Sequence, residues 1–297
     1  MQINLIYNET AGDGNHSIST IVKRLKDQGA NVLAFDKKSG DPSDFLMIKC
    51  DFLLIAGGDG TVQEILKKII KAPVPFAILP LGNANNMAES LNLNDYLFKI
   101  LQNWKNKKTT LLSIGYLEHK GKTDYFFESV GWGLFADTLA RIKKEKKRST
   151  RSPGDKVAFG LKKLKDSVNE LKSSHYQIEV DGRDYSGEYV WIEVMNTPYM
   201  GPNLHLAPKA DPEDQFLDVI LIKKSEKEKV ERFIEHQKQK EHYGFDLALK
   251  AREIRINFEG SMHVDDNVLE GESKNRSYQN WLKLCLYPKK LCLVPSY

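Results

Sequence analysis

Apolar and polar positions follow two different periods in the first third of the chain. Short apolar runs have the length of strands, and residues 51–57 (DFLLIAG) form an uninterrupted run, as expected of a strand buried on both faces. The stretches between these runs place apolar residues three and four positions apart, which predicts helices. The predicted strands are 3–8, 31–37, 51–57 and 75–81, and the predicted helices are 17–28, 61–71, 85–91 and 95–104, with Thr61 as an N-cap. This alternation predicts an α/β domain over residues 1–108, built on a parallel sheet with helices on both faces.

The pattern changes near residue 110, where strand-like runs become dominant. Residues 109–133 contain two runs around a Lys-Gly-Lys turn, and residues 176–196 contain a second pair that turns at Asp181-Gly182. One helical pattern, residues 226–240, interrupts the strand-like runs that continue to the C-terminus. Residues 109–297 are therefore predicted to form an all-β sandwich, with the last residues able to return to the first domain.

Composition and charge favour a cytoplasmic protein of two domains. The chain has 297 residues, more than one domain usually contains, and its hydrophobic content of 41% supports an ordinary core. Three cysteines lack C-x-x-C spacing, no signal-peptide pattern is present, and no apolar run approaches the ~20 residues of a membrane span. The net charge of +4 is too small to indicate nucleic-acid binding.

The turn AGGDGT, residues 56–61, follows a predicted strand and opens a predicted helix. Its glycines would let a ligand approach the backbone, and the N–H groups of the helix N-terminus would suit a phosphate. The lysine of a Walker motif is missing, but Asp59 could hold Mg²⁺ against the phosphates or accept a proton from a hydroxyl group. The alternative is a tight structural turn with a capping aspartate, because short glycine motifs also occur without function.

Two further polar turns are expected at the same edge of the sheet. PLGNANNMAESL, residues 80–91, follows the next strand, and NETAG, residues 8–12, follows the first strand. Because the carboxyl ends of parallel strands meet at one edge, the three turns together predict a nucleotide cleft. The candidate nucleotide-binding residues are Asn8, Thr10, Gly12, Gly57, Gly58, Asp59, Gly60, Thr61, Gly82, Asn83 and Asn85.

The pair GGDGT and PLGNANNMA resembles the catalytic domain of the diacylglycerol kinase superfamily, which includes bacterial soluble lipid kinases and sphingosine kinases. Residues 126–139 resemble a segment in the first strands of that family's β domain, and residues 203–223 and 264–271 resemble later motifs, so the similarity covers nearly the whole chain. The resemblance implies an NAD-kinase-like, Rossmann-type α/β domain followed by a β-sandwich that binds lipid. NAD kinases share GGDGT, but PLGNANNMA lacks their Leu-Gly-Phe continuation and fits the lipid kinases.

Several positions depart from the family pattern. Asn83 and Asn86 replace a threonine and an aspartate of the second motif. Asp214 lies where relatives carry an acid that often binds a structural Mg²⁺. Together with Asp211 and Asp218 it could hold a hard cation, and a polar turn without a metal is the alternative.

A further departure concerns the base that would activate a lipid hydroxyl. The relatives carry Asp-Gly-Glu in a turn that reads Asp265-Asp266-Asn267 here. Asn267 cannot act as a base, so the resemblance implies that Asp265 or Asp59 takes the proton. A charged hairpin turn without a catalytic role is the alternative.

The sequence thus predicts a lipid kinase that uses ATP and Mg²⁺, with Asp59 and Asp214 as metal ligands and Asp59 and Asp265 as catalytic acids. Two alternatives stay open. One is a kinase of a soluble hydroxyl compound such as NAD. The other is a nucleotide- or lipid-binding homologue without activity, for which the loss of acids at Asn86 and Asn267 would be the expected direction.

A basic segment, residues 141–151 (RIKKEKKRSTR), holds seven basic residues and one acid, and residues 154–172 after it show an amphipathic helical pattern with lysines on one side. Each basic residue near an anionic leaflet contributes ~1 kcal/mol, so the segment could bring the enzyme transiently to the membrane that carries its substrate. A solvated loop is the ordinary alternative, and no aromatic interleaving supports nucleic acid. A homodimer is also compatible with the sequence.

Overall fold

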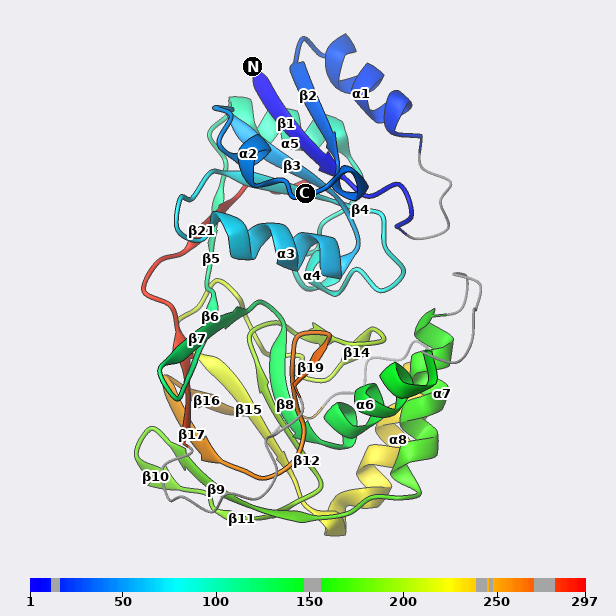
Figure 1. Ribbon diagram of the computed structural model, residues 1–297, viewed down its shortest axis with the longest axis vertical. Coiled ribbons are helices and arrows are strands. Elements are labelled where there is room, and N and C mark those ends of the chain that lie inside the picture. Colours follow the sequence, from blue (N-terminus) through cyan, green and yellow to red (C-terminus); the bar gives the residue numbers. More distant parts are fainter. Residues whose placement is uncertain (12–16, 147–155, 239–244, 246–247, 270–280) are drawn as a thin grey trace. The chain divides into compact units, whose positions relative to one another are not determined.

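The computed structural model describes residues 1–11, 17–146, 156–238, 245, 248–269 and 281–297 (Figure 1). The chain divides into two compact units, of which unit 1 comprises Met1–Leu112 and Lys289–Tyr297, and unit 2 comprises Ser113–Pro288. The boundary between the units lies at 112/113, whereas the sequence pattern placed it at 108/109. The difference arises because β5 (Thr110–Leu112) belongs to the sheet of unit 1. The last residues of the chain also belong to unit 1, where they form β21 (Leu291–Leu293).

Unit 1 is built on one six-stranded sheet. The other strands are β1 (Gln2–Tyr7), β2 (Asn31–Asp36), β3 (Phe52–Gly57) and β4 (Phe76–Pro80). The helices are α1 (Ile18–Asp27), α2 (Ser43–Leu46), α3 (Asp59–Ile69), α4 (Asn86–Ser90) and α5 (Leu97–Lys105), with a 3-10 turn η1 (Lys37–Ser39). The strand order is β2-β1-β3-β4-β21-β5, in which β5 is antiparallel to β21 and the other neighbours are parallel.

The central strand β3 is buried along its whole length because both faces of the sheet are covered. Phe52 and Leu54 belong to a cluster that includes Leu25 of α1 and Ile100 of α5. Leu53 and Ile55 alternate with these β3 residues and point to the opposite face of the sheet, where α3 packs on β3. This two-sided burial explains the continuous apolar run in the sequence.

The described part of unit 2 contains two large antiparallel sheets, a small two-stranded sheet and a layer of helices. Its strands are β6 (Gly115–His119), β7 (Lys122–Phe126), β8 (Ser129–Gly133), β9 (Ser174–Val180), β10 (Arg183–Asp184), β11 (Gly187–Tyr189), β12 (Trp191–Met195), β13 (Tyr199–Met200), β14 (Leu204–His205), β15 (Leu217–Ile222), β16 (Leu249–Ala251), β17 (Glu253–Asn257), β18 (Met262–Val264), β19 (Asn267–Leu269) and β20 (Leu282–Leu286). One sheet has the order β10-β9-β17-β20-β6-β7, with β11 paired to β9, and the other has the order β16-β15-β12-β8-β18-β19. The helices are α6 (Leu134–Lys146), α7 (Lys156–Val168) and α8 (Lys227–Lys238), with a 3-10 turn η3 (Lys224–Glu226).

The second sheet of unit 2 is covered on both faces. Ile192 and Val194 of β12 belong to the core between the two sheets. Trp191 and Met195 alternate with them and belong to a second cluster, which the helices α6, α7 and α8 complete. Unit 2 is therefore a β-sandwich with helices packed on one outer face, and the predicted α/β plus all-β class is confirmed.

Two local predictions are wrong. The helix after β3 begins at Asp59 with Gly58 as N-cap, and not after Thr61, because the Thr61 and Val62 N–H groups already donate to the Gly58 carbonyl at 2.9 and 3.1 Å. The second half also contains α6 in addition to the predicted helices, of which α7 lies within the helical pattern of residues 154–172. Gly133, in the left-handed region (φ 76°), ends β8, and α6 begins at the next residue.

Candidate functional site

The turns after β1, β3 and β4 lie side by side at the carboxyl edge of the sheet in unit 1, because these strands are parallel neighbours. Backbone hydrogen bonds join the turns, since Asn8 N donates to Ala56 O (3.1 Å) and Leu81 N donates to Gly57 O (3.0 Å). The side-chain nitrogen Nδ2 of Asn8 also donates to the Thr61 hydroxyl oxygen at 3.4 Å. The three polar turns are therefore one connected structure.

The glycines of these turns have two different roles. A Cβ on Gly82 would lie 2.5 Å from Gly58 Cα and 2.7 Å from Asn85 Oδ1. Gly60 differs, because no described atom outside its own helix lies within 4 Å of its Cβ position, and it is exposed in the first turn of α3. The contact between Gly58 and Gly82 therefore keeps two turns together, whereas Gly60 is where a ligand could approach the backbone.

The side chain of Asn85 closes the turn after β4. Its backbone is left-handed (φ 53°), its Oδ1 accepts from Gly82 N at 2.8 Å, and its Nδ2 donates to Gly82 O at 2.9 Å. Asn83, between them, is half-buried. Asn85, a candidate nucleotide contact, thus also shapes the backbone on which Asn83 is carried.

The turn after β1 is organised by the Asn8 side chain. The amide N–H and the hydroxyl group of Thr10 donate to Asn8 Oδ1 at 3.2 and 2.9 Å, and Thr10 is exposed. Gly12, the third candidate of this turn, lies outside the described residues.

Asp59 is the first residue of α3 and is nearly buried, with 9% of its surface exposed. Its Oδ1 accepts from Met87 N at 3.2 Å, which links the helix N-terminus to the helix that follows β4. A negative charge is favoured at this end of a helix by the helix dipole. Asp59 is thus a carboxylate fixed beside the N–H groups of a helix N-terminus, and carboxylate oxygen is a ligand that Mg²⁺ prefers.

In unit 2, Asp265 occupies the turn between β18 and β19 in a left-handed conformation (φ 50°) and is 3% exposed. Its Oδ1 accepts from the backbone N–H groups of Phe127, Glu128 and Ser129 at 3.1, 2.8 and 3.3 Å. Its own N–H donates to Ser129 O at 2.8 Å. The predicted base therefore anchors its turn to the segment before β8, and the adjacent Asp266 is exposed at the tip.

A buried ion pair lies directly behind this turn. His263 Nε2 lies 2.9 Å from Glu193 Oε1, and His263 Nδ1 lies 2.7 Å from the Asp265 carbonyl oxygen. A backbone carbonyl can only accept, so Nδ1 carries a proton, and an imidazolium form of His263 would also donate to the Glu193 carboxylate. Burial lowers the pKa of His263, but the Glu193 carboxylate and the Asp265 carbonyl more than offset it, and the pKa is raised overall. The pair fixes the backbone of the Asp265 turn.

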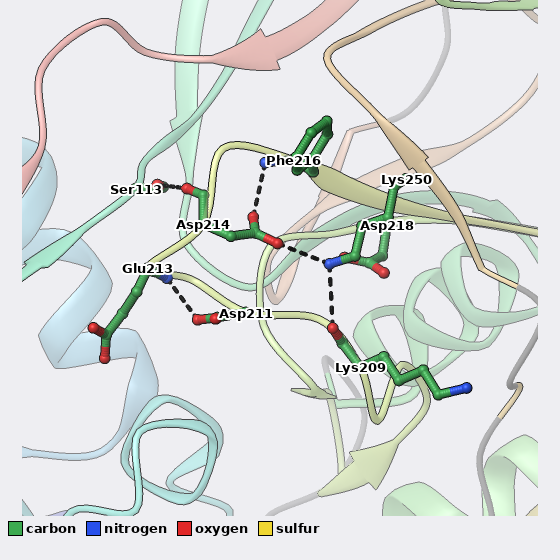
Figure 2. A network of polar contacts seen from close by, with 8 residues as sticks. All are labelled: Ser113, Lys209, Asp211, Glu213, Asp214, Phe216, Asp218 and Lys250. Carbon is green, nitrogen blue, oxygen red and sulfur yellow. Dashed lines mark hydrogen bonds and ion pairs between the residues drawn. The ribbon is translucent and has the colours of Figure 1, made fainter.

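The acids near the third motif surround a lysine ammonium (Figure 2). Lys250 Nζ donates to Asp214 Oδ2 and Asp218 Oδ2, each at 2.9 Å, and to Lys209 O at 3.2 Å. The Asp211 carboxylate instead closes its own turn, because its Oδ1 accepts from Glu213 N at 2.9 Å. Among the described residues no group of three or more acids, histidines or cysteines could hold a metal ion. The trio expected to bind a hard cation is thus not assembled.

Sequence reasoning missed three residues of these networks: Lys250, His263 as an ion-paired group, and Glu193. Burial raises the pKa of Asp218 despite its contact with Lys250, and the pKa of Lys250 itself is raised because its two carboxylate partners outweigh desolvation. The sequence signal that could have indicated the buried pair is the position of Glu193 inside the otherwise apolar stretch WIEVM of β12.

The basic segment lies only partly within the described residues. Residues 147–151 are outside them, and Arg141, at its start, pairs with Glu170 at 2.8 Å. No helix in the described part of the chain is long and apolar enough to cross a membrane.

Two protein families match consecutive regions of the chain. The family described as "Diacylglycerol kinase catalytic domain" matches residues 2–117, and "YegS C-terminal NAD kinase beta sandwich-like domain" matches residues 135–275. A diacylglycerol kinase of Staphylococcus epidermidis is 23% identical over 94% of this chain and 88% of its own length. A YegS-like lipid kinase of Yersinia enterocolitica is 23% identical over 70% of this chain and 71% of its own length.

Solved structures share the fold. A diacylglycerol kinase structure from Bacillus anthracis has a TM-score of 0.68 at 17% identity and covers 99% of this chain and 96% of its own. An NAD kinase from Archaeoglobus fulgidus in complex with ATP has a TM-score of 0.54 at 13% identity and covers 100% of this chain and 94% of its own. At these identities the likeness concerns the fold, which agrees with the predicted NAD-kinase-like architecture.

Proposed function

The chain belongs to the diacylglycerol kinase catalytic-domain superfamily, a family of lipid kinases, and we propose that it transfers the γ-phosphate of ATP to the hydroxyl group of a membrane lipid. The observation that carries this proposal is the connected set of turns at the carboxyl ends of β1, β3 and β4. In open α/β sheets, ligands bind at that edge. The turns combine backbone N–H groups at a helix N-terminus with one fixed carboxylate.

We propose that the phosphates of ATP bind at the N-terminus of α3, over Gly60. The helix N–H groups and dipole would stabilise their negative charge, and the absence of a side chain at Gly60 would allow close approach. Asp59 would hold Mg²⁺, and the ion, when bound, neutralises charge on the phosphates. A Walker lysine is then not needed, because the metal ion held by Asp59 and the helix N–H groups would neutralise the charge on the phosphates.

We propose that either Asp265 or Asp59 takes the proton of the lipid hydroxyl. The three backbone N–H groups that bind the Asp265 carboxylate give it a firm position. Phosphoryl transfer relies mainly on positioning and charge neutralisation, so a modest contribution from the base suffices.

The proposal is tested by transfer of radiolabelled phosphate from ATP and Mg²⁺ to lipids in mixed micelles. Diacylglycerol, phosphatidylglycerol, ceramide and sphingosine would be offered, with NAD as the soluble alternative. Asp59→Asn and Asp265→Asn are run beside the wild type, and the unfolding temperature of each variant is measured to separate lost chemistry from lost folding. A labelled lipid that disappears with Asp59→Asn supports the proposal.

Two results would favour the alternatives. Labelled NAD without labelled lipid would indicate a kinase of a soluble compound, for which the shared fold with an NAD kinase leaves room. Binding of ATP without any transfer in a single turnover would indicate a binding protein that lost activity along with the acids replaced by Asn86 and Asn267.

We also propose that the enzyme is cytoplasmic and binds the membrane transiently through residues 141–151. The seven basic residues of this segment would be attracted to an anionic leaflet, and salt would weaken the attraction. Sedimentation with vesicles of phosphatidylglycerol and phosphatidylcholine should show binding that falls between low and high salt. Equal binding to neutral vesicles would contradict this role.

A further inference from the structure

The Lys250 ammonium group lies in a cage of three oxygen atoms. Asp214 Oδ2 and Asp218 Oδ2 lie 2.9 Å from Nζ, and the Lys209 carbonyl oxygen lies 3.2 Å from it (Figure 2). An ammonium group has three N–H donors and no acceptor, so these three acceptors use its full hydrogen-bonding capacity. Two carboxylates and a carbonyl are also the ligands that a hard divalent cation would take.

The fold itself delivers the lysine to this position. β16 pairs with β15 in a register that places Lys250 directly opposite Asp218. Opposite charges at directly paired positions of antiparallel strands stabilise the pairing. The side chain of Asp218 is only 2% exposed, so its carboxylate depends on a partner. Strand pairing thus places Lys250 beside Asp218, although the lysine side chain itself is 37% exposed.

The loop that carries Asp214 is closed by further hydrogen bonds. Asp214 Oδ1 accepts from Phe216 N at 2.7 Å, and the Asp214 carbonyl accepts from the Ser113 hydroxyl at 2.7 Å. The Ser113 N–H donates to Pro212 O at 2.7 Å. Ser113 is the first residue of unit 2, so the cation cage and the entry of the chain into this unit are held together.

We propose that Lys250 is a built-in cation that replaces a divalent metal ion in this loop. A metal at the same place would meet the positive charge of Nζ and would compete with it for the same oxygens. This loop therefore folds without a structural metal, and the Mg²⁺ of the proposed kinase reaction would serve nucleotide chemistry alone. This inference concerns the stability of unit 2 and stands whether or not the proposed lipid is the substrate.

The test is thermal unfolding of the nucleotide-free protein in chelator, in Ca²⁺ and in Mg²⁺. The wild type should unfold at the same temperature in all three. Lys250→Ala removes the cation that the two carboxylates share, so its unfolding temperature should fall by several degrees in chelator and recover in millimolar Ca²⁺. The recovery should disappear in the double variant Lys250→Ala with Asp214→Asn.

Lys283→Ala is the matched control. Lys283 pairs with Glu253 at 2.6 Å in the other sheet of the sandwich, and both side chains remain largely exposed to solvent (43% and 45%), whereas the Asp218 side chain beside Lys250 is buried. This variant loses a lysine and an ion pair but should gain no response to Ca²⁺. A general effect of Ca²⁺ on this protein would appear in both variants and would count against the cage.

Two results would overturn the inference. One is a wild-type protein that Ca²⁺ or Mg²⁺ stabilises in a manner lost with Asp214→Asn. The other is a folded Lys250→Ala protein that gains no response to Ca²⁺. If Lys250→Ala does not fold, titration calorimetry of Ca²⁺ into the wild type and Asp214→Asn still decides, because specific binding to the wild type alone would refute a site filled by lysine.

Discussion

Replacing Gly82 with alanine tests whether the contact between two turns holds the nucleotide edge together. The new Cβ would lie 2.5 Å from Gly58 Cα and 2.7 Å from Asn85 Oδ1. Carbon atoms in contact normally lie ~3.5–4.0 Å apart, so the overlap is about 1 Å. Both neighbours belong to the backbone or to a side chain that closes the turn, and neither can rotate away. Overpacking of this kind costs ~1–3 kcal/mol.

The measurements are the unfolding temperature and the dissociation constant of ATP. Gly82→Ala should lower the unfolding temperature by several degrees and weaken ATP binding, because the turns must separate. Gly60→Ala is the control, since its Cβ would meet no described atom outside its own helix within 4 Å. It should keep or raise stability, by up to ~1 kcal/mol for glycine to alanine within a helix. It should nevertheless weaken ATP binding, because the methyl group would occupy the proposed phosphate position.

Two results would contradict these expectations. A Gly82→Ala protein as stable as the wild type would show that the two turns can separate freely, and the glycine contact would then have no structural importance. A Gly60→Ala protein that binds ATP as tightly as the wild type would show that the phosphates do not approach Gly60, whatever the outcome for Gly82.

Three further predictions concern the acids and the buried ion pair. The pKa of His263 is raised in the folded protein, so the ion pair with Glu193 contributes its full stability below the unfolded pKa of ~6.5. This stability is lost as the pH rises through the folded pKa. Chemical denaturation over a pH series should show the decline in the wild type and not in His263→Gln. Asp265→Asn should destabilise the protein by ~1–3 kcal/mol, because it places an amide group against the backbone N–H groups of Phe127, Glu128 and Ser129. Asp266→Asn should leave the denaturation midpoint unchanged, because Asp266 is exposed. If Asp266→Asn nevertheless abolished phosphate transfer, the acid of that turn would be Asp266 and the assignment to Asp265 would be wrong. Asp59→Asn keeps an acceptor for Met87 N, so we expect near-normal stability with transfer reduced at least a hundredfold. A titration of the remaining transfer rate against Mg²⁺ should show that a higher Mg²⁺ concentration is needed for half of the maximal rate, because a proposed ligand of the ion is lost.

The sequence alone determined the features that depend on neighbouring residues. The apolar run of β3 and the helical spacing after it predicted the parallel sheet of unit 1, because strand and helix periods are local properties. The hairpin turns at Lys120-Gly121 and Asp181-Gly182 were readable for the same reason, and both adopt the positive φ values that such turns need. The three polar turns at one sheet edge followed from parallel strand order.

Only the tertiary structure decided which distant residues meet. Lys250 faces Asp218 because of the β15–β16 register, and a slip of one residue would turn the lysine to the other face of the sheet. Glu193 and His263 are 70 residues apart and meet because β12 and β18 both pair with β8. The contact between Gly58 and Gly82 likewise depends on how closely two loops approach. Such pairings are set by strand register and packing, which no local pattern records, and they decide whether an acid binds a metal, a lysine or its own backbone.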